Sequence, residues 1–193
     1  DELNIEYTSL EIEKWLQPFQ HLHVHTDGDS LSSQWRMFQS LSDTIGEIFY
    51  GAPFVVKKKN AINENELPGI FGKHKERLLF MDVDDAVEGK RNKSFSNSKE
   101  AKLTADCLTK LLKSGADAVA ITPYKGQLAE IRNHLPEEHH KSVRTVDGFQ
   151  GKEADFIVLS LVRNNKRTGS ARRWGFFRDP RRINVALSRS REG

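Results

Sequence analysis

The chain has 193 residues, of which 37% are hydrophobic and 30% charged, which suits one domain or one lobe of a larger protein and excludes an intrinsically disordered chain. The net charge of +3 is too small to identify a partner, and the single cysteine, Cys107, excludes an internal disulfide. No apolar run approaches the roughly 20 residues that span a membrane, and the polar N-terminus is unlike a signal peptide. We therefore expect an intracellular protein, cytoplasmic or nuclear, with no membrane contact.

Hydrophobic spacing predicts strands that alternate with helices along the chain. The predicted helices cover residues 11–19, 34–48, 101–112, 126–135 and 181–189. The predicted strands cover residues 21–26, 77–83, 118–121, 142–146 and 156–162. Asn97 has the form of an N-cap with Glu100 as its capping-box partner, and Gly115 is the expected helix stop. This alternation predicts βαβ units and an α/β fold with a mostly parallel sheet flanked by helices.

Polar clusters follow several of the predicted strands. Residues 122–124 follow one strand, and residues 147–151 follow another. Because ligands bind beyond the carboxyl ends of parallel strands, these clusters are candidate binding residues. A basic stretch at residues 163–191 is either a phosphate-binding footprint or a solvated face, and composition alone favours neither.

Three segments have distinctive sequences. They are LSSQWRM at residues 31–37, TVDGFQGKEADFIVLS at residues 145–160 and GFFRDPRRINVALSRSR at residues 175–191. In order and wording they resemble motifs IV, V and VI of superfamily 1 helicases, in the branch that includes the nonsense-mediated-decay RNA helicase and senataxin. ITPYKGQ at residues 121–127 resembles a further block of that branch. The resemblance implies a second RecA-like motor domain of P-loop-NTPase type over residues 1–193, with residues 1–30 as a lead-in and residues 31–193 bearing the motifs.

The resemblance also implies a role for two arginines. Arg36 in motif IV and Arg189 in motif VI would reach the γ-phosphate of ATP and stabilise the charge that develops on it during transfer. A guanidinium suits this task because it stays charged and its planar fork matches phosphate oxygens. The competing interpretation is that both arginines are surface salt-bridge partners.

The remaining candidates divide between two ligands. On the nucleotide side they are Gln34, Trp35, Gly151, Glu153 and Arg182. On the nucleic-acid side they are Thr122, Pro123, Tyr124 and Thr145. Glycine permits close approach to a ligand, a carboxylate can accept from ribose hydroxyls, and a hydroxyl or backbone N–H can hold a phosphate. Tyr124 could instead be ordinary packing.

This sequence departs from the family pattern at two places near motif IV. Trp35 stands where the family usually has tyrosine, and Phe38-Gln39 stands where it often has His-Pro. In the motif VI helix, Val185 and Leu187 are expected to be partly buried.

Two other patterns are discounted. His21, His23 and His25 alternate on one face of a predicted strand, but no cysteine or carboxylate set accompanies them, so no metal site is expected. Residues 79–85 imitate a Walker B strand but come after motif IV, so we interpret them as structural.

The sequence contains no Gly-x-x-x-x-Gly-Lys-Ser/Thr loop. The resemblance implies that this loop, the Walker B carboxylates and the Mg²⁺ ligands lie in a first RecA-like domain of a longer protein. We expect this chain alone to be inactive, and the whole protein to bind ATP, Mg²⁺ and single-stranded RNA or DNA and to move in the 5′ to 3′ direction.

Two other classes of function remain open. One is a non-catalytic helicase-like module that binds nucleic acid or protein, although such a module has no need of an arginine finger. The other is a different P-loop nucleotide enzyme, which the wording of the three motifs disfavours.

Overall fold

Strands and helices alternate through the part of the chain that the structure describes. The computed structural model describes residues 32–193 apart from 60, 64–65, 75–76, 92 and 166–173. The helix predicted at residues 11–19, the strand predicted at residues 21–26 and the three alternating histidines lie outside these residues.

The strands are, in chain order, β1 (Ser33–Gln34), β2 (Val55–Val56), β3 (Gly89–Arg91), β4 (Ser94–Ser96), β5 (Ala118–Thr122), β6 (Val143–Thr145) and β7 (Phe156–Leu159). The α-helices are α3 (Gln39–Ile45), α4 (Ser98–Lys113), α5 (Lys125–Asn133) and α7 (Pro180–Leu187). A π-helix, η1 (Gly46–Tyr50), continues α3. The 3₁₀ segments are η3 (Gly69–His74), η4 (Glu137–Ser142), η5 (Asp147–Phe149) and η6 (Gly175–Arg178).

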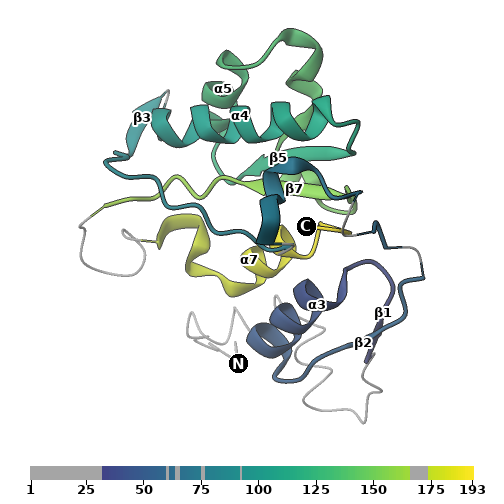
Figure 1. The fold of residues 1–193 in the computed structure, drawn as a ribbon. Helices are drawn as coiled ribbons and strands as arrows, with labels where there is room; N and C mark the ends of the chain where they lie inside the picture. Colours follow the sequence, from purple (N-terminus) through teal and green to yellow (C-terminus); the bar gives the residue numbers. More distant parts are fainter. Residues whose placement is uncertain (1–31, 60, 64–65, 75–76, 92, 166–173) are drawn as a thin grey trace, which may run out of the picture. The chain divides into compact units, whose positions relative to one another are not determined.

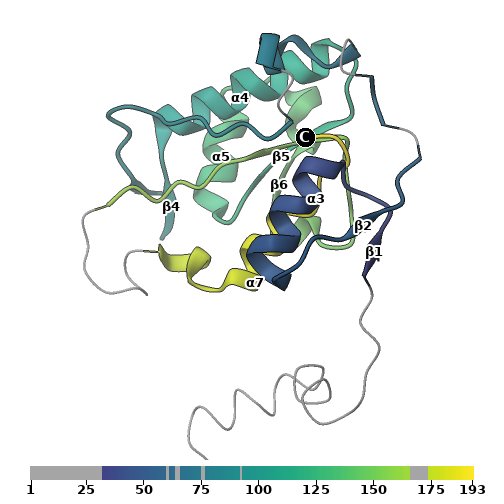
Figure 2. The same ribbon diagram turned by 60° about the horizontal axis from the view of Figure 1, so that its bottom comes forward.

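The main sheet places β5 between β6 and β7, and all three strands are parallel. Helices α4 and α5 lie over one face of this sheet and α7 lies over the other (Figures 1 and 2). Two short ladders accompany it, β1 parallel to β2 and β3 antiparallel to β4. The predicted α/β fold with a parallel sheet flanked by helices is therefore confirmed.

Each face of the sheet has its own core. On the α4 and α5 face, Leu108, Ile131 and Phe156 are buried together. On the α7 face, Ile121 and Ala186 belong to a second buried cluster. Full burial of a large apolar side chain contributes about 1.5–3 kcal/mol, so a strand buried on both faces is a strong anchor for the loops at its ends.

Helix α4 begins where the sequence predicts. The side chain of Asn97 accepts a hydrogen bond from the backbone N–H of Glu100, and Gly115 follows the helix at φ +80°. The second half of the predicted capping box is wrong, because the Glu100 carboxylate does not accept from the Asn97 N–H, which donates to the Gln127 side chain instead. The carboxylate accepts from the Ser160 hydroxyl at 2.9 Å and from the Val162 N–H at 2.9 and 3.0 Å. Glu100 thus holds the chain just beyond β7.

The helix predicted at residues 34–48 begins later. The Gln34 side chain accepts from the N–H groups of Arg36 and Met37 at 2.9 and 2.7 Å and donates to the Met37 carbonyl at 2.9 Å. These bonds satisfy the backbone in a turn, so they compete with a helix. The α-helix starts at Gln39 instead, and Trp35 and Arg36 stand on the turn before it.

The strand predicted at residues 77–83 is wrong. These residues join no ladder of the described chain, and Leu78, Leu79, Phe80 and Met81 are exposed. The Ile157 N–H of β7 donates to the Gly193 carbonyl at 2.8 Å, outside any ladder with residues 77–83. An apolar run identifies a strand only if a partner is present to satisfy its backbone.

The other predicted elements that lie within the described residues differ from the structure at their ends only. The predicted strand at residues 156–162 stops at Leu159, and Val162 has a φ of +71°. A β-branched residue rarely adopts this conformation, and here the Val162 N–H is held by Glu100. Val185 and Leu187 are partly buried, as predicted, and Cys107 is buried.

Candidate nucleotide and nucleic-acid sites

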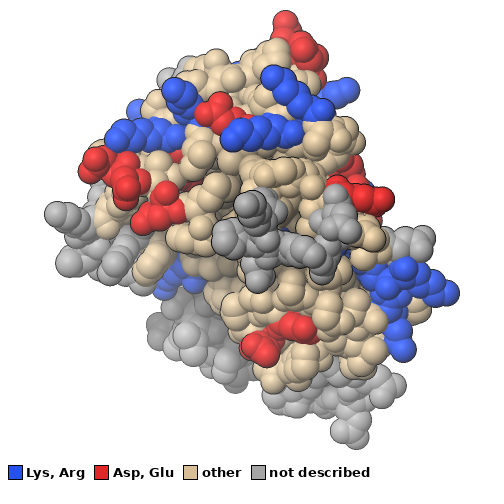
Figure 3. Space-filling model, in the orientation of Figure 1, with Lys and Arg blue, Asp and Glu red and all other residues tan. Residues whose placement is uncertain are grey.

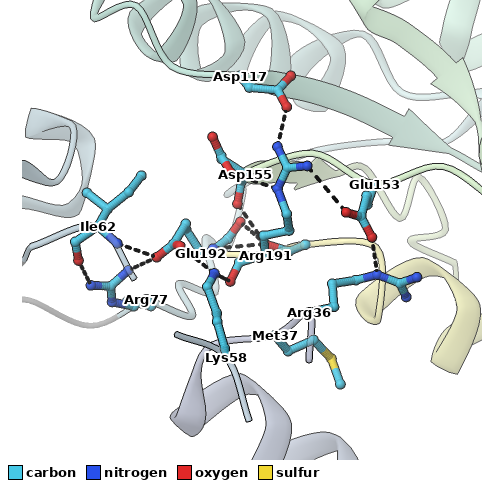
Figure 4. Close-up of polar contacts among 12 residues, drawn as sticks. Arg36, Met37, Lys58, Ile62, Arg77, Asp117, Glu153, Asp155, Arg191 and Glu192 are labelled. Atoms are coloured by element: carbon cyan, nitrogen blue, oxygen red, sulfur yellow. Dashed lines mark hydrogen bonds and ion pairs between the residues drawn. The ribbon is translucent and has the colours of Figure 1, made fainter. Parts of the chain in front are cut away.

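Arg36 connects three segments that are far apart in the sequence. Its Nε donates to Oε2 of Glu153 at 2.5 Å, and its Nη1 donates to the Ser188 carbonyl at 3.0 Å. Arg36 lies on the turn before α3, Glu153 lies before β7, and Ser188 is the C-cap of α7. The fold therefore brings residues of the predicted motifs IV, V and VI into direct contact (Figure 4).

Arg189 lies beside this contact at the end of α7. Its guanidinium donates to the Val185 carbonyl and to the Ser188 hydroxyl, both at 3.0 Å. Burial lowers the pKa of Arg189, and the positive charge of Arg36 lowers it further, although an arginine stays protonated at any physiological pH. The electrostatic repulsion between Arg36 and Arg189 would be relieved by an anion placed between them.

Glu153 compensates part of this positive charge. A hydrogen bond from Arg36 lowers the pKa of its carboxyl, and a second bond from Arg191 acts in the same direction. The sequence assigned Arg191 no role. Its three nitrogens contact three carboxylates, with Nε–Asp155 at 2.8 Å, Nη2–Asp117 at 2.7 Å and Nη1–Glu153 at 3.3 Å. Figure 4 shows Arg191 between these carboxylates.

A buried ion cluster lies behind these residues, and no sequence signal indicates it. The Glu192 carboxylate, whose side chain is 3% exposed, contacts both Lys58 and Arg77. It also accepts from the Ile62 N–H at 3.2 Å. The Arg77 guanidinium lies 3.8 Å from the centre of the Phe38 ring. The cluster thus connects the residue after Arg191 to the start of α3.

An opening with a volume of about 640 Å³ adjoins Arg36. It is lined by Gln34, Trp35, Arg36, Met37, Lys58, Lys59, Glu153 and Arg191. Four of the residues predicted on the nucleotide side or as fingers therefore share one opening. Trp35 is 66% exposed, so its ring is free of the core. An exposed indole face, lysines and an arginine form a chemically suitable surface for a base and its phosphates.

Three other predicted residues do not line this opening. Arg189 is an electrostatic neighbour of Arg36, which does line the opening. Gly151 is exposed at φ +74° in the turn after η5, where a β-carbon would meet no atom within 4 Å beyond its chain neighbours. Arg182 is exposed on α7 and lies over the Phe176 ring, 4.7 Å from its centre.

The residues predicted on the nucleic-acid side lie at the carboxyl ends of β5 and β6. Thr122 pairs with Thr145 in the β5–β6 register. Thr122 is fully buried, and its hydroxyl is 3.5 Å from the Tyr124 N–H. The Thr145 hydroxyl accepts from the Gly148 N–H at 3.1 Å. Thr145 and Pro123 remain partly exposed.

Tyr124 is packed by side chains from several elements. Its ring lies edge-on to Phe95 of β4, with the centres 5.5 Å apart. Its hydroxyl accepts from the Phe176 N–H at 3.3 Å. Arg163 also covers the Phe95 ring and pairs with Glu88 at 2.8 Å. Tyr124 therefore has a packing role, whatever else it contacts.

Charge on the visible surface is mixed. Figure 3 shows lysine and arginine side chains in separate groups, with acidic groups among them. Residues 166–173 of the predicted basic stretch lie outside the described residues.

Neither a metal cluster nor a membrane-spanning helix occurs in the described part of the chain. Its residues contain no group of three or more His, Cys, Asp or Glu side chains that could hold a metal ion. No helix in the same residues has the length and apolar character needed to cross a bilayer.

Comparisons with known proteins agree with the motifs. A family model described as an AAA domain matches residues 14–193. Regulator of nonsense transcripts 1 from Dictyostelium discoideum is 33% identical over 177 residues, which cover 86% of this chain and 13% of that protein. The DNA-binding protein SMUBP-2 from mouse is 30% identical over 172 residues, covering 83% of this chain and 17% of that protein.

A third relative is named as a helicase. The mouse 5′-3′ DNA helicase ZGRF1 is 33% identical over 171 residues, covering 83% of this chain and 8% of that protein. The chain thus spans less than a fifth of the length of each of these relatives. By the family match and these relatives, the chain belongs to the AAA domain family and to the superfamily 1 helicases, in the branch that includes regulator of nonsense transcripts 1.

Proposed function

We propose that this chain is the second motor domain of an ATP-dependent superfamily 1 helicase and supplies Arg36 and Arg189 as arginine fingers. The observation that carries the proposal is that Arg36 of motif IV donates both to Glu153 of motif V and to the carbonyl of Ser188, the residue next to Arg189 of motif VI. A structural role would be served by pairing each cation with its own carboxylate. Arg189 instead donates to the Val185 carbonyl and the Ser188 hydroxyl, which are neutral, so its positive charge stays available for a bound anion.

The residues around the opening suit a nucleotide. Trp35 offers a flat ring for a base, and Glu153 can accept from ribose hydroxyls. Gly151 does not line the opening, but it is exposed in the turn after η5 and would allow close backbone approach there. Gln34 sets the turn that presents Trp35 and Arg36. When bound, ATP with Mg²⁺ supplies the phosphoryl group whose negative charge the arginines stabilise in the transition state. The Mg²⁺ ligands and the P-loop would come from a first motor domain of the same protein.

The carboxyl ends of β5 and β6 would form part of a track for single-stranded RNA or DNA. Thr145, Pro123 and Tyr124 are accessible there to a backbone, and Thr122 is buried and would act by holding the turn. Phosphates are the same in RNA and DNA and carry no sequence information, so a track that contacts phosphates serves either polymer. We place Arg182 on the coupling path between the two ligands, because it lies on α7, the helix that ends just before Arg189, and contacts the Phe176 ring. The Phe176 N–H in turn donates to the Tyr124 hydroxyl.

Opening and closing of the cleft between two motor domains would move the strand, and we propose 5′ to 3′ movement, the direction in the name of one relative. The whole protein would act inside the cell. Membership of the family and the mixed surface charge are compatible with either nucleic acid.

The test is ATP hydrolysis by the whole protein, with and without single-stranded RNA and DNA. We expect strong stimulation by at least one polymer. Arg36→Ala and Arg189→Ala should each lower the stimulated rate by about 10³-fold while nucleic-acid affinity stays within about twofold, because a finger acts mainly in the transition state. Lys102→Ala, which removes a positive charge from an exposed position of α4, should leave the rate unchanged.

Two results would contradict the proposal in different ways. Stimulated hydrolysis that survives Arg189→Ala would refute the finger assignment. A wild-type protein that binds single strands but hydrolyses no ATP would favour the non-catalytic binding module.

A further inference from the structure

We propose that Arg191 is a positioning residue that fixes Glu153 and, through Glu153, holds the finger Arg36 at the opening. This inference rests on the proposed function above. It concerns a residue two positions after Arg189, whose side chain would otherwise be interpreted as part of a basic surface.

The carboxylate of Glu153 is shared between two guanidiniums. Its Oε2 accepts from Nε of Arg36 at 2.5 Å, and its Oε1 lies 3.3 Å from Nη1 of Arg191. The side chain of Glu153 is 40% exposed and that of Arg36 is 35% exposed. A single ion pair at this exposure would be loose, because solvent screens it and both side chains can rotate. A carboxylate whose two oxygens each contact a guanidinium is restricted to one orientation.

Arg191 is itself firmly placed. Besides Glu153, its guanidinium contacts Asp155 at 2.8 Å and Asp117 at 2.7 Å. Its backbone N–H donates to the Ala154 carbonyl at 2.9 Å. Its own carbonyl accepts from the Phe38 N–H at 3.0 Å, at the start of α3 and two residues from Arg36. Arg191 therefore connects the turn that carries Arg36 with the segment that carries Glu153 (Figure 4).

The arrangement has a consequence for the finger. When Arg36 turns toward a phosphate, Glu153 loses its closer partner. Arg191 remains beside Glu153 and keeps its charge compensated, so the exchange leaves no unpaired carboxylate. A lysine could supply the charge but has no planar fork with which to contact Glu153, Asp155 and Asp117 together.

The experiment compares Arg191→Lys with Asp117→Asn in the whole protein. Lysine keeps a positive charge among the three carboxylates, so the fold should be retained, and thermal unfolding checks this. We expect Arg191→Lys to lower kcat of the stimulated ATPase about tenfold with KM for ATP changed less than about twofold. Asp117→Asn removes a negative charge but keeps an oxygen that can accept from Nη2 of Arg191, and Asp155 and Glu153 still hold the guanidinium, so activity should stay within about twofold of wild type.

A binding measurement gives an independent readout. Affinity for ADP with aluminium fluoride, which imitates the phosphoryl group in the transition state, should fall about tenfold in Arg191→Lys. Affinity for ADP alone should fall much less, because ADP lacks the γ-phosphate that Arg36 would contact. In a Glu153→Gln background, Arg191→Lys should add less than about a twofold further loss, because the residue through which it acts is already impaired.

The outcomes separate this inference from the proposed function. An equal loss from Arg191→Lys in both backgrounds, or an equal loss from Asp117→Asn, would make Arg191 merely structural. Full activity of Arg191→Lys together with an inactive Arg189→Ala would overturn the positioning role and leave the finger intact. An inactive wild-type protein would refute the proposed function, and the positioning role with it.

Discussion

The two proposed ligand sides of this domain are built in opposite ways. On the nucleotide side, Arg36 and Glu153 are 35% and 40% exposed and rest on a layer of ion pairs behind them. On the nucleic-acid side, Thr122 is fully buried and Tyr124 is packed against Phe95. Under the proposed assignment, different residues would serve function and stability on the nucleotide side. On the nucleic-acid side, the same residues would serve both.

The separation depends on Glu192, which lies behind the nucleotide side. Glu192→Ala leaves the buried Arg77 and the partly buried Lys58 without their carboxylate, and removing one partner of a buried ion pair costs about 3–5 kcal/mol. This is the largest loss of stability that we expect, and urea unfolding of residues 1–193 measures it. Glu138→Ala, at an exposed position of η4, should change the free energy of unfolding by less than about 0.5 kcal/mol. Similar values for the two variants would mean that no supporting layer exists.

Tyr124 tests the coupling on the nucleic-acid side. Tyr124→Ala removes a half-buried ring and should cost about 2 kcal/mol of stability while weakening single-strand binding. Tyr124→Phe keeps the ring and loses only the hydroxyl that accepts from Phe176, so about 1 kcal/mol is expected, with binding nearly preserved. Urea unfolding and fluorescence anisotropy with a labelled oligonucleotide provide the two measurements. If Tyr124→Phe kept full stability but bound single strands weakly, the hydroxyl would contribute to binding alone. Stability and binding would then be separable on the nucleic-acid side too.

The smallest expected effect is a pH dependence at Glu153. The hydrogen bond from Arg36 lowers the pKa of Glu153, so its stabilisation is present above the unfolded value of about 4.3 and is lost as the pH falls through the lower folded value. Because the pair is partly exposed, this contribution should stay below about 1 kcal/mol. The difference in unfolding free energy between wild type and Glu153→Gln should shrink between pH 7 and about pH 3.5. A difference that is the same at both pH values would show that the pair contributes nothing to stability.

Local signals in the sequence were sufficient for the elements of the main sheet and for the start of α4. Residues 118–121 are a short apolar run between a glycine-ended helix and a turn, and they form the buried strand β5. Asn97 caps α4 through its own side chain, an interaction that spans three residues. Such features depend on neighbours in the chain, so they can be predicted without the fold. The motif wording likewise indicated Arg36, Glu153 and Arg189, which the structure brings together.

Tertiary structure alone decided which charges are buried and which strands find partners. Glu192 and Arg77 are 115 positions apart, and each is a residue type that is normally exposed. No local sequence pattern therefore predicts their buried contact. Arg191 gains its role only because the fold places Asp117, Asp155 and Glu153 around it. Residues 77–83 have the pattern of a strand yet join no ladder of the described chain. The physical reason is the same in each case: a charge or a backbone edge is stabilised by a partner, and distant parts of the chain supply that partner only once it has folded.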